Sequence, residues 1–92
     1  MNKEKYRVMA AEKGYDEPIE RSLEANIFND SHTHDYALFL YITEGEISVT
    51  IDGKNGSETT TCSSGQTIEV PAGVLHTERI GSDGVTILVA RK

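Results

Sequence analysis

The strongest constraint on the fold is the apolar pattern of residues 38–52. The run Leu-Phe-Leu-Tyr-Ile at 38–42 is apolar at both even and odd positions. Because successive side chains of a strand point to opposite faces, a strand of this composition has to be covered on both sides. Residues 47–52 then alternate apolar and polar side chains, which is the pattern of a strand with one face in the core. A β-sheet is therefore expected at the centre of the fold.

Glycine, proline and asparagine divide the rest of the chain into short extended segments. Such residues mark the turns between strands, and several short strands at a spacing of about 8–12 residues predict a sandwich or barrel. Turns are expected at 26–31, 44–45, 52–56, 63–65 and 71–73, a loop at 81–84, and further strands at 19–25, 58–62, 66–70 and 85–89.

The N-terminal segment predicts a short helix over residues 2–13. Its apolar residues recur at three- and four-residue spacing, and Gly14 stands where a helix is expected to end. A frayed tail is the alternative interpretation. Because 92 residues suffice for one domain only, we expect residues 1–16 to pack as a helical segment on a single β-barrel domain of residues 17–92.

Charge and composition exclude several classes of function. The formal net charge is −6, with 15 acidic against 9 basic residues, which argues against a nucleic-acid partner. No apolar run approaches the roughly 20 residues of a membrane span, and no apolar signal segment follows Met1. The single cysteine, Cys62, allows no disulfide within the chain, so the cytoplasm is the expected location.

The three histidines of the chain stand at metal-ligand spacing. His32 and His34 are separated by one residue, and His76 follows the turn at 71–73. In an extended strand His32 and His34 point to the same face. Two imidazoles on one strand, with a third from another strand, form half of a transition-metal shell. The alternative is three unrelated surface histidines, because a His-x-His pair also occurs by chance.

The residues around both histidine motifs resemble the two motifs of the cupin superfamily. The first family motif is Gly, five residues, His-x-His, three or four residues, Glu, six residues, Gly. The second is Gly, five residues, Pro-x-Gly, two residues, His, three residues, Asn. The matching positions are Gly65, Pro71, Gly73 and His76 in the second motif, and His32, His34 and Gly45 in the first.

Three positions depart from the family pattern. The leading glycine is Asn26, the glutamate ligand is Leu38, and the closing asparagine is Ile80. The resemblance spans residues 26–80 and implies an all-β fold, the double-stranded β-helix or jelly-roll barrel of a small single-domain cupin. It implies less about function, because cupins host many unrelated activities.

Strand periodicity indicates which side chains share the barrel interior with the histidines. Residues of the same parity as His32 and His34 continue along their strand, and residues of the same parity as His76 continue along its strand. Leu38 then places an apolar side chain in the pocket wall, at the position where the family has a carboxylate ligand. Glu78 is left with three roles, as a ligand, as a hydrogen-bond partner or as a solvated residue at the rim. The expected pocket-lining residues are Tyr36, Leu38, Leu40, Glu78 and Ile80.

Three neutral imidazoles leave a divalent ion with its full charge, which favours a small anionic molecule in the open positions. Imidazole suits several transition metals, so Fe, Mn, Ni, Cu and Zn all stay open. The enzyme hypothesis is a metal-dependent oxygenase, isomerase or lyase acting on a small anionic substrate. The alternatives are a non-catalytic cupin that binds or senses a small ligand, and a cupin that has lost its metal.

Phe39 and Tyr41 face away from the expected ligands on a strand too apolar to be left in water. A contiguous apolar patch of this kind marks an interface, so the sequence predicts a homodimer. Ile19 and Leu23 are expected to extend the same surface. The competing interpretation is that the N-terminal helix covers the patch within one chain.

Overall fold

The computed structural model describes residues 1–53 and 55–92, and these form one helix and six strands. The expected turn at 52–56 is a hairpin in which Gly53 pairs with Gly56, and its residue 54 lies outside the described residues. The elements are α1 (Lys3–Glu12), β1 (Ile19–Leu23), β2 (Phe28–His32), β3 (Leu38–Gly53), β4 (Gly56–Ser63), β5 (Thr67–Val70) and β6 (His76–Arg91).

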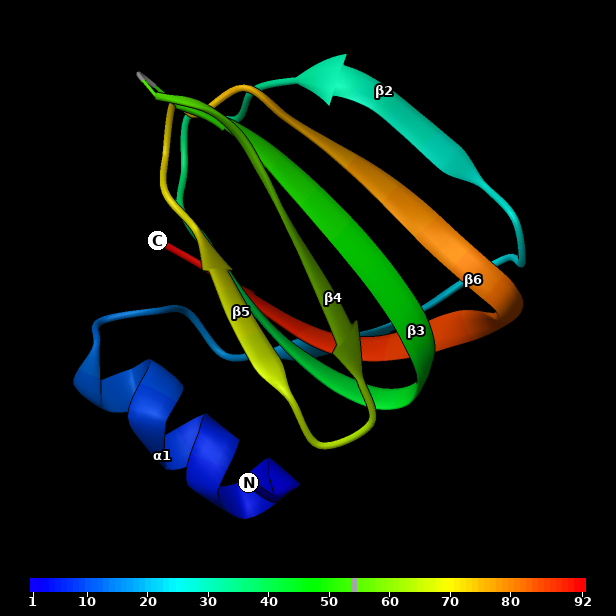
Figure 1. Cartoon of the computed structure of the whole chain (residues 1–92). Coiled ribbons are helices and arrows are strands. Elements are labelled where there is room, and N and C mark those ends of the chain that lie inside the picture. The colour runs from blue at the N-terminus through cyan, green and yellow to red at the C-terminus, as the bar shows by residue number, and fades with distance from the viewer. Residues whose placement is uncertain (54) are drawn as a thin grey trace.

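The two long strands, β3 and β6, each belong to two layers. The N-terminal half of β3 pairs with β5 and with the C-terminal half of β6, whereas its C-terminal half pairs with β4 and with the N-terminal half of β6. The N-terminal half of β6 also pairs with β2, and its C-terminal half also pairs with β1. The result is two antiparallel layers that share their bent central strands (Figure 1), so the predicted jelly-roll fold is confirmed.

The turn expected at 44–45 and the loop expected at 81–84 are bends within continuous strands. Pairing between β3 and β6 runs across both positions, with register shifts on either side of Gly45. Gly45 has a φ of 83°, and a Cβ there would lie 2.0 Å from the main-chain oxygen of Gly84. Only glycine accommodates both this backbone conformation and this close approach. The sequence therefore located the bends correctly but not the continuity of the strands.

The prediction of a turn at 26–31 was wrong for most of these residues. Residues 28–32 form β2, an edge strand whose one partner among the described strands is β6. Its residues Asn29, Asp30 and Ser31 are polar, which is typical of a turn, but a strand at the edge of a sheet tolerates polar residues because it is not covered.

The alternation at 38–42 places side chains on two separate apolar clusters. Leu38, Leu40 and Ile42 pack between the layers with residues of β4, β5 and the rest of β3 and β6. Phe39 and Tyr41 pack on the outer face of the sheet, together with residues of α1 and the end of β6. The prediction that both faces of this strand are covered is therefore confirmed.

Helix α1 is capped at both ends. The side chain of Asn2 accepts a hydrogen bond of 2.9 Å from the N–H of Lys5, as a helix N-cap does. At the C-terminus, Gly14 has a φ of 86° and the N–H of Tyr15 donates to the carbonyl of Ala10, which closes the helix in a Schellman motif. No helix in the described part of the chain has the length and apolar character that crossing a membrane requires.

The helix covers the patch on which the homodimer was predicted. Tyr6 and Ala10 of α1 contact the outer cluster, and Phe39 and Tyr41 are only 2% and 7% exposed within a single chain. The prediction of an interface at Phe39 and Tyr41 was therefore wrong, because burial is completed by α1. Ile19 does not join this patch either, since its side chain lies at the cavity described below.

A buried hydrogen bond fixes α1 on the sheet, and its removal is expected to be measurable. The Tyr6 hydroxyl donates to the main-chain oxygen of Phe39 and lies 3.3 Å from that of Leu88. Tyr6→Phe should lower the free energy of unfolding by about 1–3 kcal/mol, because a buried carbonyl loses its partner. Urea unfolding measures this change. Tyr41→Phe is the matched control, since the one partner of that hydroxyl in the described part of the chain is the terminal Met1 carbonyl. Equal losses in the two variants would contradict the prediction.

Candidate metal centre

The fold brings the three histidines together at one end of the layers. His32 is the last residue of β2 and lies directly opposite His76, the first residue of β6. His34 lies in the loop that follows β2. Its main-chain oxygen accepts a hydrogen bond of 2.8 Å from the N–H of Gly73. This bond ties the first motif to the Pro-x-Gly turn of the second.

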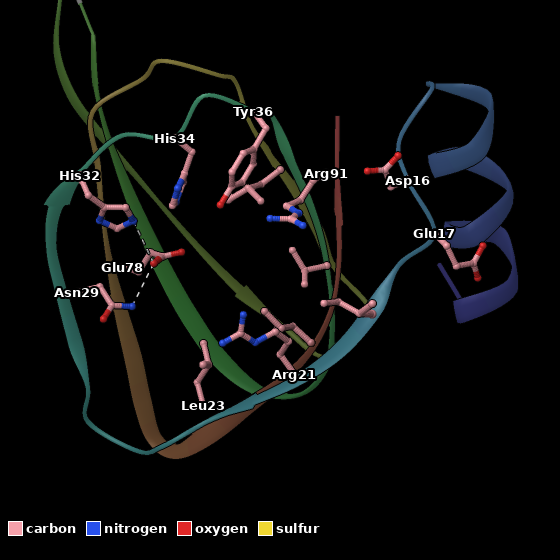
Figure 2. Close-up of a pocket in the computed structure, with 14 residues that line it drawn as sticks. Asp16, Glu17, Arg21, Leu23, Asn29, His32, His34, Tyr36, Glu78 and Arg91 are labelled. Carbon is pink, nitrogen blue, oxygen red and sulfur yellow. Dashed lines mark hydrogen bonds and ion pairs between the residues drawn. The ribbon is translucent and has the colours of Figure 1, made fainter.

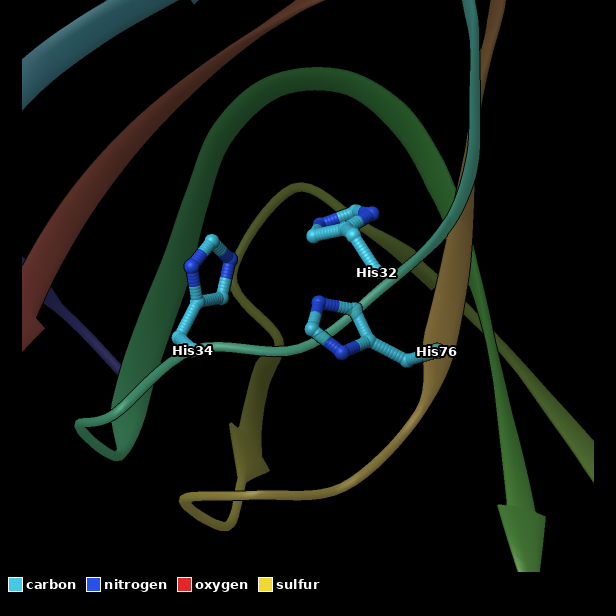
Figure 3. A group of neighbouring side chains, drawn as sticks. All are labelled: His32, His34 and His76. Carbon is cyan, nitrogen blue, oxygen red and sulfur yellow. The ribbon is translucent and has the colours of Figure 1, made fainter.

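The three imidazole rings face a common space (Figure 3). The centroid of the His76 ring lies 4.3 Å from that of His32 and 5.3 Å from that of His34, and the two remaining rings are 4.9 Å apart. One ring nitrogen from each residue lies within 4.8 Å of the other two. Nitrogens on one ion would lie about 3–3.5 Å apart, so side-chain adjustments of about an ångström would complete a shell.

Two of the rings are oriented by main-chain carbonyls. Nδ1 of His32 lies 2.6 Å from the oxygen of Asp30, and Nδ1 of His76 lies 3.0 Å from the oxygen of Val74. A carbonyl only accepts, so each Nδ1 carries the proton and each Nε2 keeps its lone pair. This is how metal-binding histidines are held in proteins.

The Nε2 atom of His76 provides the test of whether a metal fits. His76 is 1% exposed, and its Nε2 has no hydrogen-bond partner among the described residues. A buried acceptor without a partner costs about 1–3 kcal/mol. A cation that shares the space between the three rings would remove this cost. The donor set, three imidazoles, is one that transition metals accept.

The protonation of His34 also suits a metal. Burial lowers the pKa of its imidazole below the usual value, and the neighbouring His32 and His76 lower it further. A lowered pKa keeps the ring neutral at neutral pH, which is the form that binds a metal.

Glu78 lies beside the cluster, inside the cavity. Its Oε1 accepts a hydrogen bond of 3.1 Å from Nδ2 of Asn29 and lies 3.6 Å from Nε2 of His32. Its side chain is 16% exposed. Of the three roles left open by the sequence, the structure favours a hydrogen-bonded carboxylate within the site over a solvated residue at the rim. Glu78 is not one of the three residues whose ligand atoms all converge.

A cavity of about 470 Å³ opens from His32 and His34 between the layers (Figure 2). Its remaining lining falls into three groups. Near the histidines lie Asn29, Tyr36 and Glu78, the apolar walls are mainly Ile19, Leu23, Leu38, Ile87 and Val89, and the other charged lining residues are Asp16, Glu17, Arg21 and Arg91.

The expected pocket-lining residues divide into two sets. Tyr36, Leu38 and Glu78 line the cavity. Leu40 and Ile80 do not reach its wall in the described structure, and both are buried in the core between the layers. They have the inward parity that the sequence indicates, but they lie two residues further along their strands, where the layers pack against each other.

Sequence reasoning missed Asn29 and both arginines of the cavity. A signal for Arg21 existed, since it shares the parity of Ile19 and Leu23 in an expected strand. Arg91 likewise continues the parity of the last strand. Neither pattern shows which distant residues the strand faces, and β1 and β6 pair through residues 62 to 70 positions apart in sequence.

The sequence profile of the cupin domain matches residues 23–90. The chain belongs to the cupin domain family. The match includes both histidine motifs, so the resemblance drawn from the motif residues is confirmed. No curated protein matches the chain.

Solved structures similar to this cupin include oxalate decarboxylases. A tyrosine-for-tryptophan variant of the Bacillus subtilis enzyme superposes with a TM-score of 0.74 at 20% identity, over 94% of this chain and 23% of that protein. The formate complex of the Lactobacillus farciminis enzyme gives 0.72 at 20% identity, over 82% and 22%. Another B. subtilis structure is described by its Mn(II) centres. This cupin spans less than a quarter of these proteins, and the likeness shows the fold.

Proposed function

We propose that this cupin holds one divalent transition-metal ion through His32, His34 and His76 and binds a small anionic molecule beside it. The observation that carries this proposal is the buried Nε2 of His76, which has no partner among the described residues and faces two other imidazoles. The anchored Nδ1 atoms of His32 and His76 support it, because they aim the lone pairs without a metal being needed to do so.

The chain's own residues define what such a site offers. A bound ion would supply Lewis acidity toward a carboxylate or a water molecule. Glu78 presents a carboxylate at the edge of the cluster, where it can accept a hydrogen bond or a proton from the bound molecule. Leu38 keeps one wall dry. The carboxylate favours catalysis over simple storage, and the Mn(II) centres of a similar decarboxylase make small acids the first substrates to test.

Metal analysis tests the proposal directly. The protein is purified without an affinity tag, its metal content is measured, and the metal-free form is titrated with Ni(II), Zn(II), Fe(II) and Mn(II) by calorimetry. One ion per chain is expected. The loaded protein is then screened for dioxygen uptake and carbon dioxide release with small carboxylic acids. A protein that binds none of these ions at millimolar concentration would refute the proposal and leave a metal-free cupin.

Glu78 is expected to tune metal affinity without being essential. Glu78→Gln keeps the shape of the side chain but removes a negative charge beside the ion, so affinity should fall about 10–100-fold, as for other groups around metal ligands. Calorimetry with Ni(II) measures the change. Glu20→Gln on β1 is the matched control, because this carboxylate is exposed and does not line the cavity. If both variants bind as the unmodified protein does, Glu78 has no part in the site.

A further inference from the structure

Two arginines in the cavity have no role in the proposed metal site. Arg21 lies on β1 opposite Ile87 and Arg91 is the last residue of β6, and both line the cavity, Arg21 near Leu23 and Arg91 beside Tyr36 (Figure 2). Among the described residues, neither guanidinium forms an ion pair; the ion pairs of the chain involve Arg7, Lys13 and His32 instead. Both residues are exposed to solvent, and two cationic groups without counter-ions at one cavity attract an anionic ligand.

Arg91 is held in place by a stack of rings that leads to the histidines. Its Cζ lies 4.9 Å from the centroid of the Tyr36 ring, and the Tyr36 ring is stacked on His34 at 4.9 Å with an angle of 18° between the planes. Figure 2 shows Tyr36 between His34 and Arg91. A guanidinium stacked on an aromatic face keeps its N–H edges free. The stack therefore presents donors to the cavity from a fixed direction.

Much of the cavity wall is apolar. Leu38 stands directly across the β3–β6 ladder from Arg91, and Ile87 and Val89 continue the wall along β6. Leu23 of β1 adds to it. Side chains of this kind contact an apolar part of a ligand and offer it no hydrogen bond.

Two carboxylates also line the cavity, and one of them, Glu17, has an ion pair with another element. Glu17 forms an ion pair of 3.1 Å with Arg7 of α1. Asp16 is joined to Arg91 through the main chain, its N–H donating to the Arg91 carbonyl at 2.7 Å. Figure 2 shows Glu17 turned toward α1 and the Asp16 carboxylate on the cavity side, whereas the guanidinium of Arg91 turns toward Tyr36 and that of Arg21 toward the open cavity. Apart from the Asp16 carboxylate, the charged groups that face a ligand here are the two guanidinium groups.

We propose that Arg91 and Arg21 form a carboxylate-binding subsite, and that the ligand of this cupin is a small amphipathic diacid. One acid group lies at the histidine cluster, the apolar chain lies along Leu38 and its neighbours, and the second carboxylate is bound by the guanidinium groups. A planar guanidinium binds a carboxylate through two parallel hydrogen bonds. The assignment of the first acid group rests on the proposed function, whereas the arginine subsite does not.

Calorimetry on the Ni(II)-loaded protein with straight-chain dicarboxylates, from malonate to suberate, tests the proposal. Binding should peak at an intermediate length, and adipate should bind more tightly than hexanoate, which lacks the second carboxylate. Loss of a charge-assisted hydrogen bond weakens binding roughly 10–100-fold, so the R21Q/R91Q variant should lose this much affinity for adipate and none for Ni(II). R79Q is the matched control, because Arg79 stacks on Phe28 and does not line the cavity.

The outcomes separate this proposal from the metal site. If R21Q/R91Q binds Ni(II) and adipate as the unmodified protein does, the arginine subsite is overturned while the metal site stands. If the unmodified protein binds no metal, the proposed function fails, and binding of hexanoate to the metal-free protein then decides the subsite. Loss of hexanoate binding in R21Q/R91Q but not in R79Q supports it. Equal or absent binding in all three proteins overturns it.

Discussion

His76→Ala is expected to abolish stoichiometric metal binding while the fold is kept. Among the described residues, His76 contributes a buried ring nitrogen that has no hydrogen-bond partner. Without it, only two of the three imidazole ligands remain. Metal affinity should fall by more than about 100-fold, beyond the effect of groups that only support a ligand. In the unmodified protein, an ion at 100 times its dissociation constant should add about 2.7 kcal/mol to the free energy of unfolding. Thermal unfolding with and without Ni(II) measures whether this gain is lost.

The metal-free variant provides a second readout. Removing the imidazole leaves a cavity, which destabilises, but it also removes a buried acceptor that lacked a partner, which offsets part of the loss. Its unfolding should therefore differ little from that of the metal-free unmodified protein. Leu75→Ala is the control, since this neighbouring side chain is 41% exposed. A His76→Ala protein that still binds one Ni(II) with unchanged affinity would exclude the three-histidine site.

Much of the fold follows from local periodicity. The alternation at 38–42 separates Leu38 and Leu40 from Phe39 and Tyr41, and the structure places the two pairs in different clusters. The resemblance to the two cupin motifs predicted the grouping of the histidines, and His32 and His76 do pair directly across two strands. Local spacing is informative here because the side-chain period of a strand is fixed.

The remainder depends on pairing between distant segments. Polar residues alone did not distinguish β2 from a turn, because the strand is stabilised by β6 rather than by its own composition. The apolar face formed by Phe39 and Tyr41 was assigned to a second chain, but Tyr6 and Ala10 of the helix cover it. The two arginines line one cavity because β1 and β6 lie side by side. A single sequence does not encode such neighbours as a local pattern.

Leu38 is the position at which the metal-binding and metal-free interpretations predict opposite effects. Its side chain is 8% exposed, lines the cavity and packs in the core between the layers. Leu38→Glu places a carboxylate where the cupin motif has its glutamate ligand. In a metal-free cavity this carboxylate is buried and costs several kcal/mol of stability. With an ion present it adds an oxygen ligand, which hard ions such as Mn(II) favour more than Ni(II) or Zn(II) do.

Arg91 has to be controlled for in this experiment. It pairs with Leu38 across the β3–β6 ladder, and side chains directly opposite each other in a sheet interact. The new carboxylate at position 38 could therefore be stabilised by the guanidinium without a metal. Combining Leu38→Glu with Arg91→Gln removes that contact. We expect the double variant to melt lower than the unmodified protein without metal, and to regain stability when Mn(II) is added. A variant that melts lower and that no divalent ion restores would leave a cupin without a metal site.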